Sequence, residues 1–229
     1  MPAIRMSVCL FLFLAISSYS CLAQDTIKSL HFPYLPGYEL EMKGTMVTFD
    51  SYNFPSKTTE AALIYAFSEY TDTKNTIIKI SFKQIHGTDT TTVDNTRLVM
   101  DTKGMTWWGV DKENHFDDKH KTLALALPLY KGKNWKTFTN DIPVQISCIT
   151  VDTSITCPSG TFTCFGTRTN MPVKETKDYT VYVLVDEYYT DAVGRIMTVT
   201  TQFVYLKEKK RTLRIYEETL FTTLSQLKK

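Results

Sequence analysis

The chain has 229 residues, of which 43% are hydrophobic, and a formal net charge of +2. This length and apolar content suffice for one domain with a substantial core. The nearly balanced charge gives no reason to expect nucleic acid or an anionic membrane as a partner. The sequence contains no repeat, low-complexity tract or Pro/Gly-rich linker, so a single domain is expected.

The N-terminus has the pattern of a secretion signal. Arg5 is the only charged residue before Asp25, and it precedes an apolar run over residues 8–16 and a small-residue segment that ends at Ala23. A positive start, an apolar centre and a small-residue exit are typical of signal peptides. The apolar run is too short to span a bilayer as a helix, which takes about 20 residues.

We therefore expect a signal peptide over residues 1–23 and a single β-rich domain over residues 24–229. The mature protein would be exported, either periplasmic or secreted. Lipid attachment at Cys21 is an alternative that leaves the protein tethered, and a buried first helix is another. No later segment of the sequence is both apolar and long enough to span a membrane, so an integral membrane segment is not expected after signal removal.

Alternating apolar and polar residues predict strands through the first part of the domain. Tyr38, Leu40 and Met42 alternate with charged residues, as expected of a strand with one solvated face. Residues 61–85 predict a hairpin, with a short helix as the alternative. Further along, residues 90–100 and 105–110 predict strands, residues 111–121 a charged surface loop, and residues 131–135 a turn.

The last third of the chain carries the clearest strand pattern. Residues 179–185 and 197–205 alternate with period two, and residues 212–216 begin a strand that residues 219–227 continue or replace with a short helix. The dense basic stretch 207–211 lies between two of these strands and predicts a solvated hairpin tip. Strands separated only by turns favour an antiparallel meander over βαβ units. We predict a mostly β fold, a strongly curved antiparallel sheet or open half-barrel meander, with at most one or two short helices.

Three cysteines follow the predicted signal: Cys148, Cys157 and Cys164. Residues 144–151 predict a strand, and a two-residue turn at residues 152–153 would place Cys148 directly opposite Cys157. Facing cysteines at a non-hydrogen-bonded position of a ladder are close enough for a disulfide. Two adjacent buried thiols are the alternative, since free cysteine is itself a common core residue.

Four segments of the chain resemble a group of exported, largely uncharacterised bacterial proteins that are common in the Bacteroidota. They are residues 32–38 (FPYLPGY), 129–135, 156–162 and 188–195. The third segment is similar to the family's V-P-A-G-T-F signature, and the fourth is similar to its Y-A-P-G-V-G turn. The resemblance implies a curved antiparallel sheet akin to the half-barrels of lipoprotein carriers, and it implies no established activity.

No cluster in the sequence has the spacing of a catalytic or metal site. His115 and His120 flank two aspartates, but the two histidines would face opposite sides of a strand and would not share one stripe of a helix. Asp186 and Glu187 are adjacent carboxylates, and neighbours on a strand point apart. We therefore predict no catalytic residue, no metal site and no cofactor.

Three tryptophans are the candidate ligand-binding residues: Trp107, Trp108 and Trp135. Consecutive residues of a strand face opposite ways, so one member of the Trp107–Trp108 pair can pack inside while the other faces outward. An exposed tryptophan could stack on a sugar or line an apolar cleft. The alternative is that these side chains complete the core or a barrel mouth.

These observations lead to two hypotheses of function. In the first, the protein is an exported binding module that holds an apolar or amphipathic ligand on the concave face of its curved sheet. That hypothesis requires a lined cavity on the order of several hundred Å³. In the second, the protein is a ligand-free structural or interaction protein of the cell envelope, with a filled core and an exposed apolar patch. The expected partner is accordingly an unknown apolar small molecule or lipid, or an envelope protein.

Overall fold

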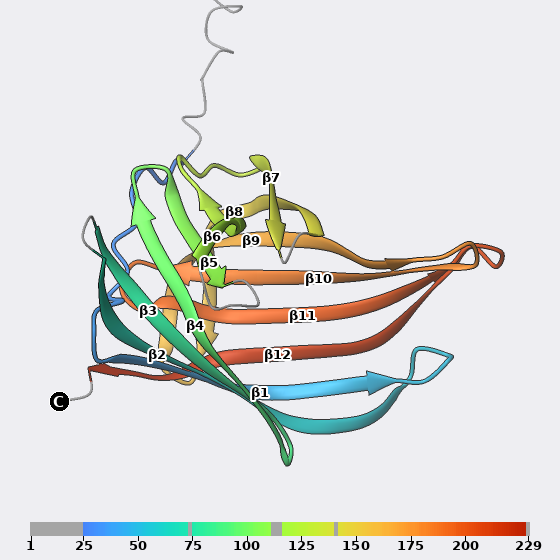
Figure 1. Cartoon of the computed structure of the whole chain (residues 1–229). Helices are drawn as coiled ribbons and strands as arrows, with labels where there is room; N and C mark the ends of the chain where they lie inside the picture. The colour runs from blue at the N-terminus through green and yellow to red at the C-terminus, as the bar shows by residue number, and fades with distance from the viewer. Residues whose placement is uncertain (1–24, 73–74, 111–115, 140–141, 228–229) are drawn as a thin grey trace, which may run out of the picture.

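The computed structural model describes residues 25–72, 75–110, 116–139 and 142–227, and this part of the chain forms strands without any helix. Twelve strands make one antiparallel sheet that nearly closes into a barrel with a single seam (Figure 1). The predicted fold class, a mostly β and strongly curved antiparallel sheet, is confirmed. The strands are β1 (Tyr38–Phe49), β2 (Pro55–Asp72), β3 (Asn75–His86), β4 (Asp89–Asp101), β5 (Gly104–Val110), β6 (Phe116–Ala126), β7 (Asn134–Thr139), β8 (Ile142–Cys157), β9 (Gly160–Glu175), β10 (Tyr179–Thr190), β11 (Gly194–Leu206) and β12 (Arg211–Leu227).

The strand order explains how the sheet closes. Strands that follow one another in sequence are neighbours in the sheet, except β6 and β7, which form its two ends. The first and last strands pair with each other, with Tyr38 opposite Leu227. The chain is therefore two meanders joined along β1 and β12, and the barrel closes where β6 meets β7.

Side chains, in place of a backbone ladder, connect the two strands at the seam. The Thr122 hydroxyl donates a 2.6 Å hydrogen bond to the Phe138 carbonyl. The Leu123 amide donates to the Thr137 hydroxyl over 2.9 Å, and the Trp135 indole N–H donates back to the Leu123 carbonyl over 2.8 Å. Trp135 therefore acts at the seam as a hydrogen-bond donor from β7 to β6.

Replacing Trp135 with phenylalanine should lower the free energy of unfolding by about 1–2 kcal/mol, because the Leu123 carbonyl loses its donor while much of the ring volume is kept. Lys136→Ala changes an exposed residue of the same strand and should stay within about 0.5 kcal/mol of the parent. Urea unfolding followed by circular dichroism measures both values. Equal effects for the two variants would show that the indole N–H does not hold the seam.

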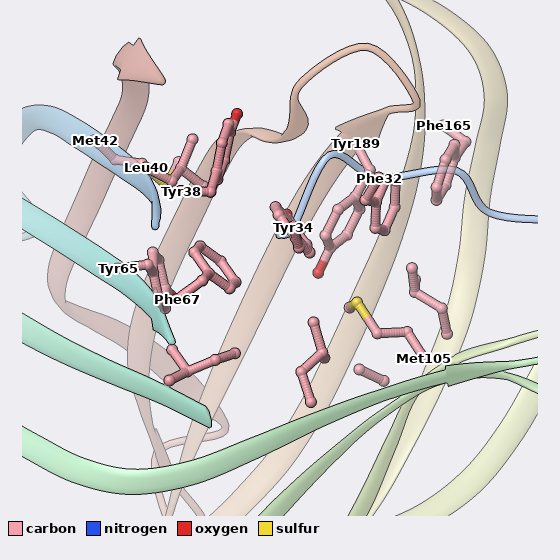
Figure 2. Packing of buried hydrophobic residues seen from close by; sticks show 14 of the residues in the cluster. Phe32, Tyr34, Tyr38, Leu40, Met42, Tyr65, Phe67, Met105, Phe165 and Tyr189 are labelled. Carbon is pink, nitrogen blue, oxygen red and sulfur yellow. The ribbon is translucent and has the colours of Figure 1, made fainter. Parts of the chain in front are cut away.

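The segment before β1 fills one end of the barrel with aromatic rings (Figure 2). Phe32 stacks on Phe165 of β9 and on Tyr189 of β10, with ring centroids 6.2 and 5.6 Å away. Tyr34 stacks on Phe67 of β2 at 4.6 Å. Although this segment contains Pro33, Pro36 and Gly37, its aromatic residues are part of the core.

The predicted cysteine hairpin is wrong, and with it the facing pair. Strand β8 continues through residues 152–153, and the chain turns only after Cys157, which lies opposite Gly160. Cys148 and Cys157 lie on the same strand, nine residues apart, or roughly 30 Å at the usual rise per residue. A disulfide between them is therefore excluded, and the three cysteines of the described residues are free thiols.

Local composition explains where this turn lies. The residues on either side of Asp152 and Thr153 are almost all β-branched, which favours a continued strand. Pro158 cannot donate to a ladder, and Gly160 has a φ of +131°, which L side chains rarely adopt. The stronger turn signal, at residues 158–159, lies six residues beyond the turn at residues 152–153 chosen from the sequence.

Two other local predictions change. The charged segment 111–121 is expected to form a loop, but residues 116–121 belong to strand β6, while residues 111–115 lie outside the described part of the chain. The alternative of a short helix over residues 219–227 is wrong, because β12 runs through that segment. In the described part of the chain, no helix is long and apolar enough to cross a membrane.

Candidate functional site

The structure separates the three tryptophans selected from the sequence. Trp107 packs against the aromatic core, 6.2 Å from the ring of Tyr65. Trp108 points to the opposite side of the sheet, where the Lys121 ammonium lies 4.0 Å from its ring centroid. Trp135 lies at the seam. Trp107 and Trp108 therefore divide between the two faces as predicted, and the three rings do not form one pocket.

A buried ion pair lies at the centre of the aromatic end of the barrel. Arg195 Nη2 is 2.7 Å from Glu187 Oε1, and the Arg195 side chain is only 8% exposed. The guanidinium also donates hydrogen bonds to the hydroxyls of Tyr65 and Tyr189. The Tyr189 hydroxyl in turn donates to the second Glu187 oxygen over 2.9 Å. Both carboxylate oxygens are therefore satisfied in the interior.

Aromatic faces surround the same guanidinium. Its central carbon lies 5.2, 5.6 and 5.7 Å from the ring centroids of Tyr65, Tyr189 and Trp107, within the range of cation–π attraction. Burial raises the pKa of Tyr65, and raises that of Tyr189 well above its ordinary value, so both stay neutral phenols. Burial is the largest single influence and opposes the charge of Arg195, but Glu187 together with the surrounding tyrosines outweighs it, so the pKa of Arg195 lies well above its usual value.

The adjacent carboxylates of β10 take different partners because neighbouring strand residues face opposite ways. Glu187 points inward to Arg195, as described above. Asp186 points outward and forms a two-pronged pair with Arg168 of β9, with N–O distances of 2.6 and 2.7 Å. The prediction that Asp186 and Glu187 point apart is confirmed, and the Arg195–Glu187 pair depends on contacts that sequence spacing does not reveal.

A second polar pair crosses the inner wall of the barrel. His86 Nε2 of β3 lies within hydrogen-bond distance of Glu218 Oε2 of β12. Strands β2 and β1 lie between them. The small Ala61 and Gly44 lie in line with His86, and Glu218 is two residues along β12 from Leu220, the residue opposite Gly44. Because Ala61 and Gly44 carry little or no side chain, the imidazole and the carboxylate can reach each other above two strands.

The aromatic end of the interior has no room for a ligand. The space between Tyr34, Tyr65, Phe67, Trp107 and Arg195 is too small to hold a water molecule. The Tyr34 hydroxyl accepts a 2.9 Å hydrogen bond from the Arg195 amide, which ties the segment before β1 to β11. This network is therefore built to hold the fold together.

A larger hollow of about 740 Å³ lies over strands β7 to β10. Lys136, Gln145 and Asn170 are cross-strand neighbours on its floor, and they alternate with Val144 and Ile146, which are buried. The groove therefore lies on the outer face of the sheet, opposite the aromatic core. Its lining residues are Lys136, Thr137, Phe138, Pro143, Val144, Gln145, Asn170, Pro172, Thr180 and Tyr182.

The chemistry of this groove is amphipathic. Phe138 is 54% exposed, and Pro143, Pro172 and Tyr182 add further apolar surface. Lys136 supplies one positive charge, while Gln145 and Asn170 supply amide donors and acceptors. These residues come from strands that are paired only in the folded sheet, so spacing along the chain gives no sign of the groove.

Two of the cysteines, Cys148 and Cys164, are buried and have raised pKa values. Burial raises the pKa of Cys164 to about 11 and raises that of Cys148, so neither forms a thiolate readily near neutral pH. The Cys148 amide and carbonyl bond to the turn before β7, with Cys148 N–H donating to the Lys133 carbonyl over 2.8 Å. Both residues are therefore structural.

The chain matches no known protein family and no curated protein in the comparisons made with them. The outer groove, together with the filled aromatic end, is therefore the basis for a functional proposal.

Proposed function

We propose that the protein is an exported binding protein that holds an amphipathic small molecule, such as a single lipid or fatty acid, in the groove over β7 to β10. The groove volume of about 740 Å³ is the observation that carries the proposal. Ligand sites typically enclose about 300–1,000 Å³ and combine apolar walls with a few polar groups. The export signal expected over residues 1–23 is consistent with an exported protein. The proposed site lies on the outer face of the sheet, whereas the hypothesis from the sequence places the ligand on the concave face.

The arrangement of polar and apolar groups suggests how such a ligand would lie. Phe138 and Pro143 face each other across β7 and β8 and offer an apolar wall for an acyl chain. Lys136 and Gln145 also face each other and offer a cation and an amide for an acidic or polar head group. An amphipathic acid satisfies both ends, whereas a purely apolar ligand would leave Lys136 unused.

The proposal predicts that Phe138→Ser and Tyr182→Ser each weaken binding of a fluorescent long-chain fatty acid about tenfold. The reason is that each change removes an aromatic contact, and burying such a side chain contributes about 1.5–3 kcal/mol. The measurement is a fluorescence titration of the purified protein, with native mass spectrometry of the same preparation to detect a ligand that co-purifies.

Tyr130→Ser provides the matched control, because Tyr130 is a partly exposed aromatic residue that does not line the groove. It should bind the probe like the parent. If the parent does not bind the probe and carries no ligand, or if all three variants bind equally, the groove is not a ligand site.

A second candidate function is a structural or interaction protein of the cell envelope. A structural or interaction protein requires a filled core, and the filled aromatic end of the barrel favours this function. Exposed Phe138 and Val173 then belong to a protein-binding face. Crosslinking in cell envelopes through a photoreactive residue at position 138 would capture one defined protein in this case, and lipid in the case of the first proposal.

A further inference from the structure

Two aromatic side chains are presented to solvent at the turn between β1 and β2. Tyr52 is 71% exposed and Phe54 is 67% exposed, the highest values among the large hydrophobic residues of the described chain. Figure 1 shows this hairpin projecting at the end of the barrel away from the N-terminal segment. Exposed aromatic residues at a projecting tip contribute nothing to the core, so a role in contact with something outside the protein is a natural explanation.

The tip is held rigidly. The Asp50 carboxylate accepts hydrogen bonds from the amides of Tyr52 and Phe54 over 2.8 and 2.9 Å. The Asn53 side chain accepts a 2.8 Å hydrogen bond from the Arg214 amide of β12. The turn is therefore ordered before any partner arrives, which reduces the entropy lost on binding.

The same contacts bring a basic turn beside the aromatic one. Arg211 Nη2 donates a 3.0 Å hydrogen bond to the Ser51 carbonyl, and so joins the β11–β12 turn to the β1–β2 turn. Residues 50–57 and 207–211 together contain the cations Lys57, Lys207, Lys209, Lys210 and Arg211, and the anions Asp50 and Glu208. Lys207 is also paired with Glu175 over 2.9 Å, so five cations face three anions here. An excess of positive charge equal to the +2 of the whole chain is thus concentrated at this end.

A row of side chains continues from this end towards the groove. Phe203 stacks on Tyr182, which lines the groove, with ring centroids 5.2 Å apart. The Arg214 guanidinium lies 6.0 Å from the Phe203 ring and 5.0 Å from the Phe49 ring. Aromatic and basic side chains therefore extend along the sheet from the groove to the β1–β2 and β11–β12 turns.

We propose that the paired turns, residues 50–54 and 207–211, form a docking surface for an anionic lipid bilayer. Aromatic side chains favour the interface between head groups and acyl chains, and lysines and arginines are attracted to the negative surface beneath them. Here Tyr52 and Phe54 insert, while Lys209, Lys210 and Arg211 contact lipid phosphates. The inference goes beyond ligand binding and does not depend on it, because the tip is separate from the groove.

Vesicle co-sedimentation of the full chain tests the proposal. The parent should bind vesicles of phosphatidylcholine with added phosphatidylglycerol more tightly than vesicles of phosphatidylcholine alone, and added salt should weaken this binding. The double variant K209Q/K210Q should bind the anionic vesicles roughly thirtyfold more weakly, since each basic residue contributes about as much as a fivefold change. Tyr52→Ser combined with Phe54→Ser should weaken binding to the same vesicles at least tenfold, by about the transfer energy of two partly inserted rings.

The matched control is K28Q/K131Q, which removes the same charge from exposed positions near the N-terminal segment and should bind like the parent. Because every variant keeps residues 1–24, any binding through the apolar N-terminus is common to all of them. Equal binding to neutral and anionic vesicles, or equal loss in the control, would overturn the proposal. Circular dichroism and the fatty acid titration confirm that each variant is folded, and they separate a failure at the tip from a failure of the groove.

Discussion

Replacing Arg195 with methionine should lower the free energy of unfolding by about 3–5 kcal/mol, the usual effect of removing one partner of a buried ion pair. The Glu187 carboxylate would be left without its countercharge in the interior, and the hydroxyls of Tyr65 and Tyr189 would lose a donor. The cation–π contacts of the guanidinium with the surrounding rings would also disappear. Urea unfolding measures the difference.

The neighbouring pair on the outer face is a built-in control. Arg168 and Asp186 have good geometry, but the Arg168 side chain is 48% exposed. Arg168→Met should therefore lower the free energy of unfolding by less than about 1 kcal/mol. If the two arginine variants differ by less than the error of the measurement, burial of the inner pair does not carry the stability assigned to it.

A double variant separates charge from packing. In Arg195→Met with Glu187→Leu, the unpaired carboxylate is gone, and apolar replacement of a buried ion pair often recovers stability. We expect the double variant to be more stable than Arg195→Met alone. A double variant as unstable as the single one would show that the aromatic contacts of Arg195, not its charge, provide the stability.

Local pattern was sufficient to predict the strands, because the alternation of apolar and polar residues is a property of neighbouring positions. Tyr38, Leu40 and Met42 are buried as their spacing indicates. The turn after β8 was misplaced because both candidate turns contain suitable residues, and the choice depends on the whole strand. The seam between β6 and β7 depends on closure of the sheet, which no local pattern encodes.

The buried network lay beyond sequence reasoning for a different reason. Arg195 lies 130 residues from Tyr65 and 161 from Tyr34 in the chain, and only the pairing of β1 with β12 brings them together. Gly194 beside it has a φ of +92°, and a Cβ there would lie 2.2 Å from the Tyr34 hydroxyl. Gly194 belongs to residues 188–195, the fourth segment of the family resemblance. It is required there by its backbone conformation and by its close contact with Tyr34, and neither requirement points to a catalytic or binding role.

Replacing Phe32 with alanine should lower the free energy of unfolding by about 3–5 kcal/mol, the range for removing a buried aromatic side chain. Phe32 is 6% exposed and stacks on rings from two strands. The vacated volume would lie among the rings of Tyr34, Phe165 and Tyr189, which surround Phe32 in the core. Leu35→Ala is the control in the same segment, because Leu35 is 56% exposed and should change the value by about 0.5 kcal/mol or less.

The result also decides whether the segment before β1 unfolds together with the barrel. Ile27 pairs with Leu129, and their amides and carbonyls exchange two hydrogen bonds of 2.9 Å each. If the segment belongs to the cooperative unit, Phe32→Ala will accelerate hydrogen exchange at the Ile27 amide and at strands β9 and β10 alike. Faster exchange confined to the segment, with an unchanged free energy of unfolding, would mean that the aromatic rings cover a barrel that is already stable without them.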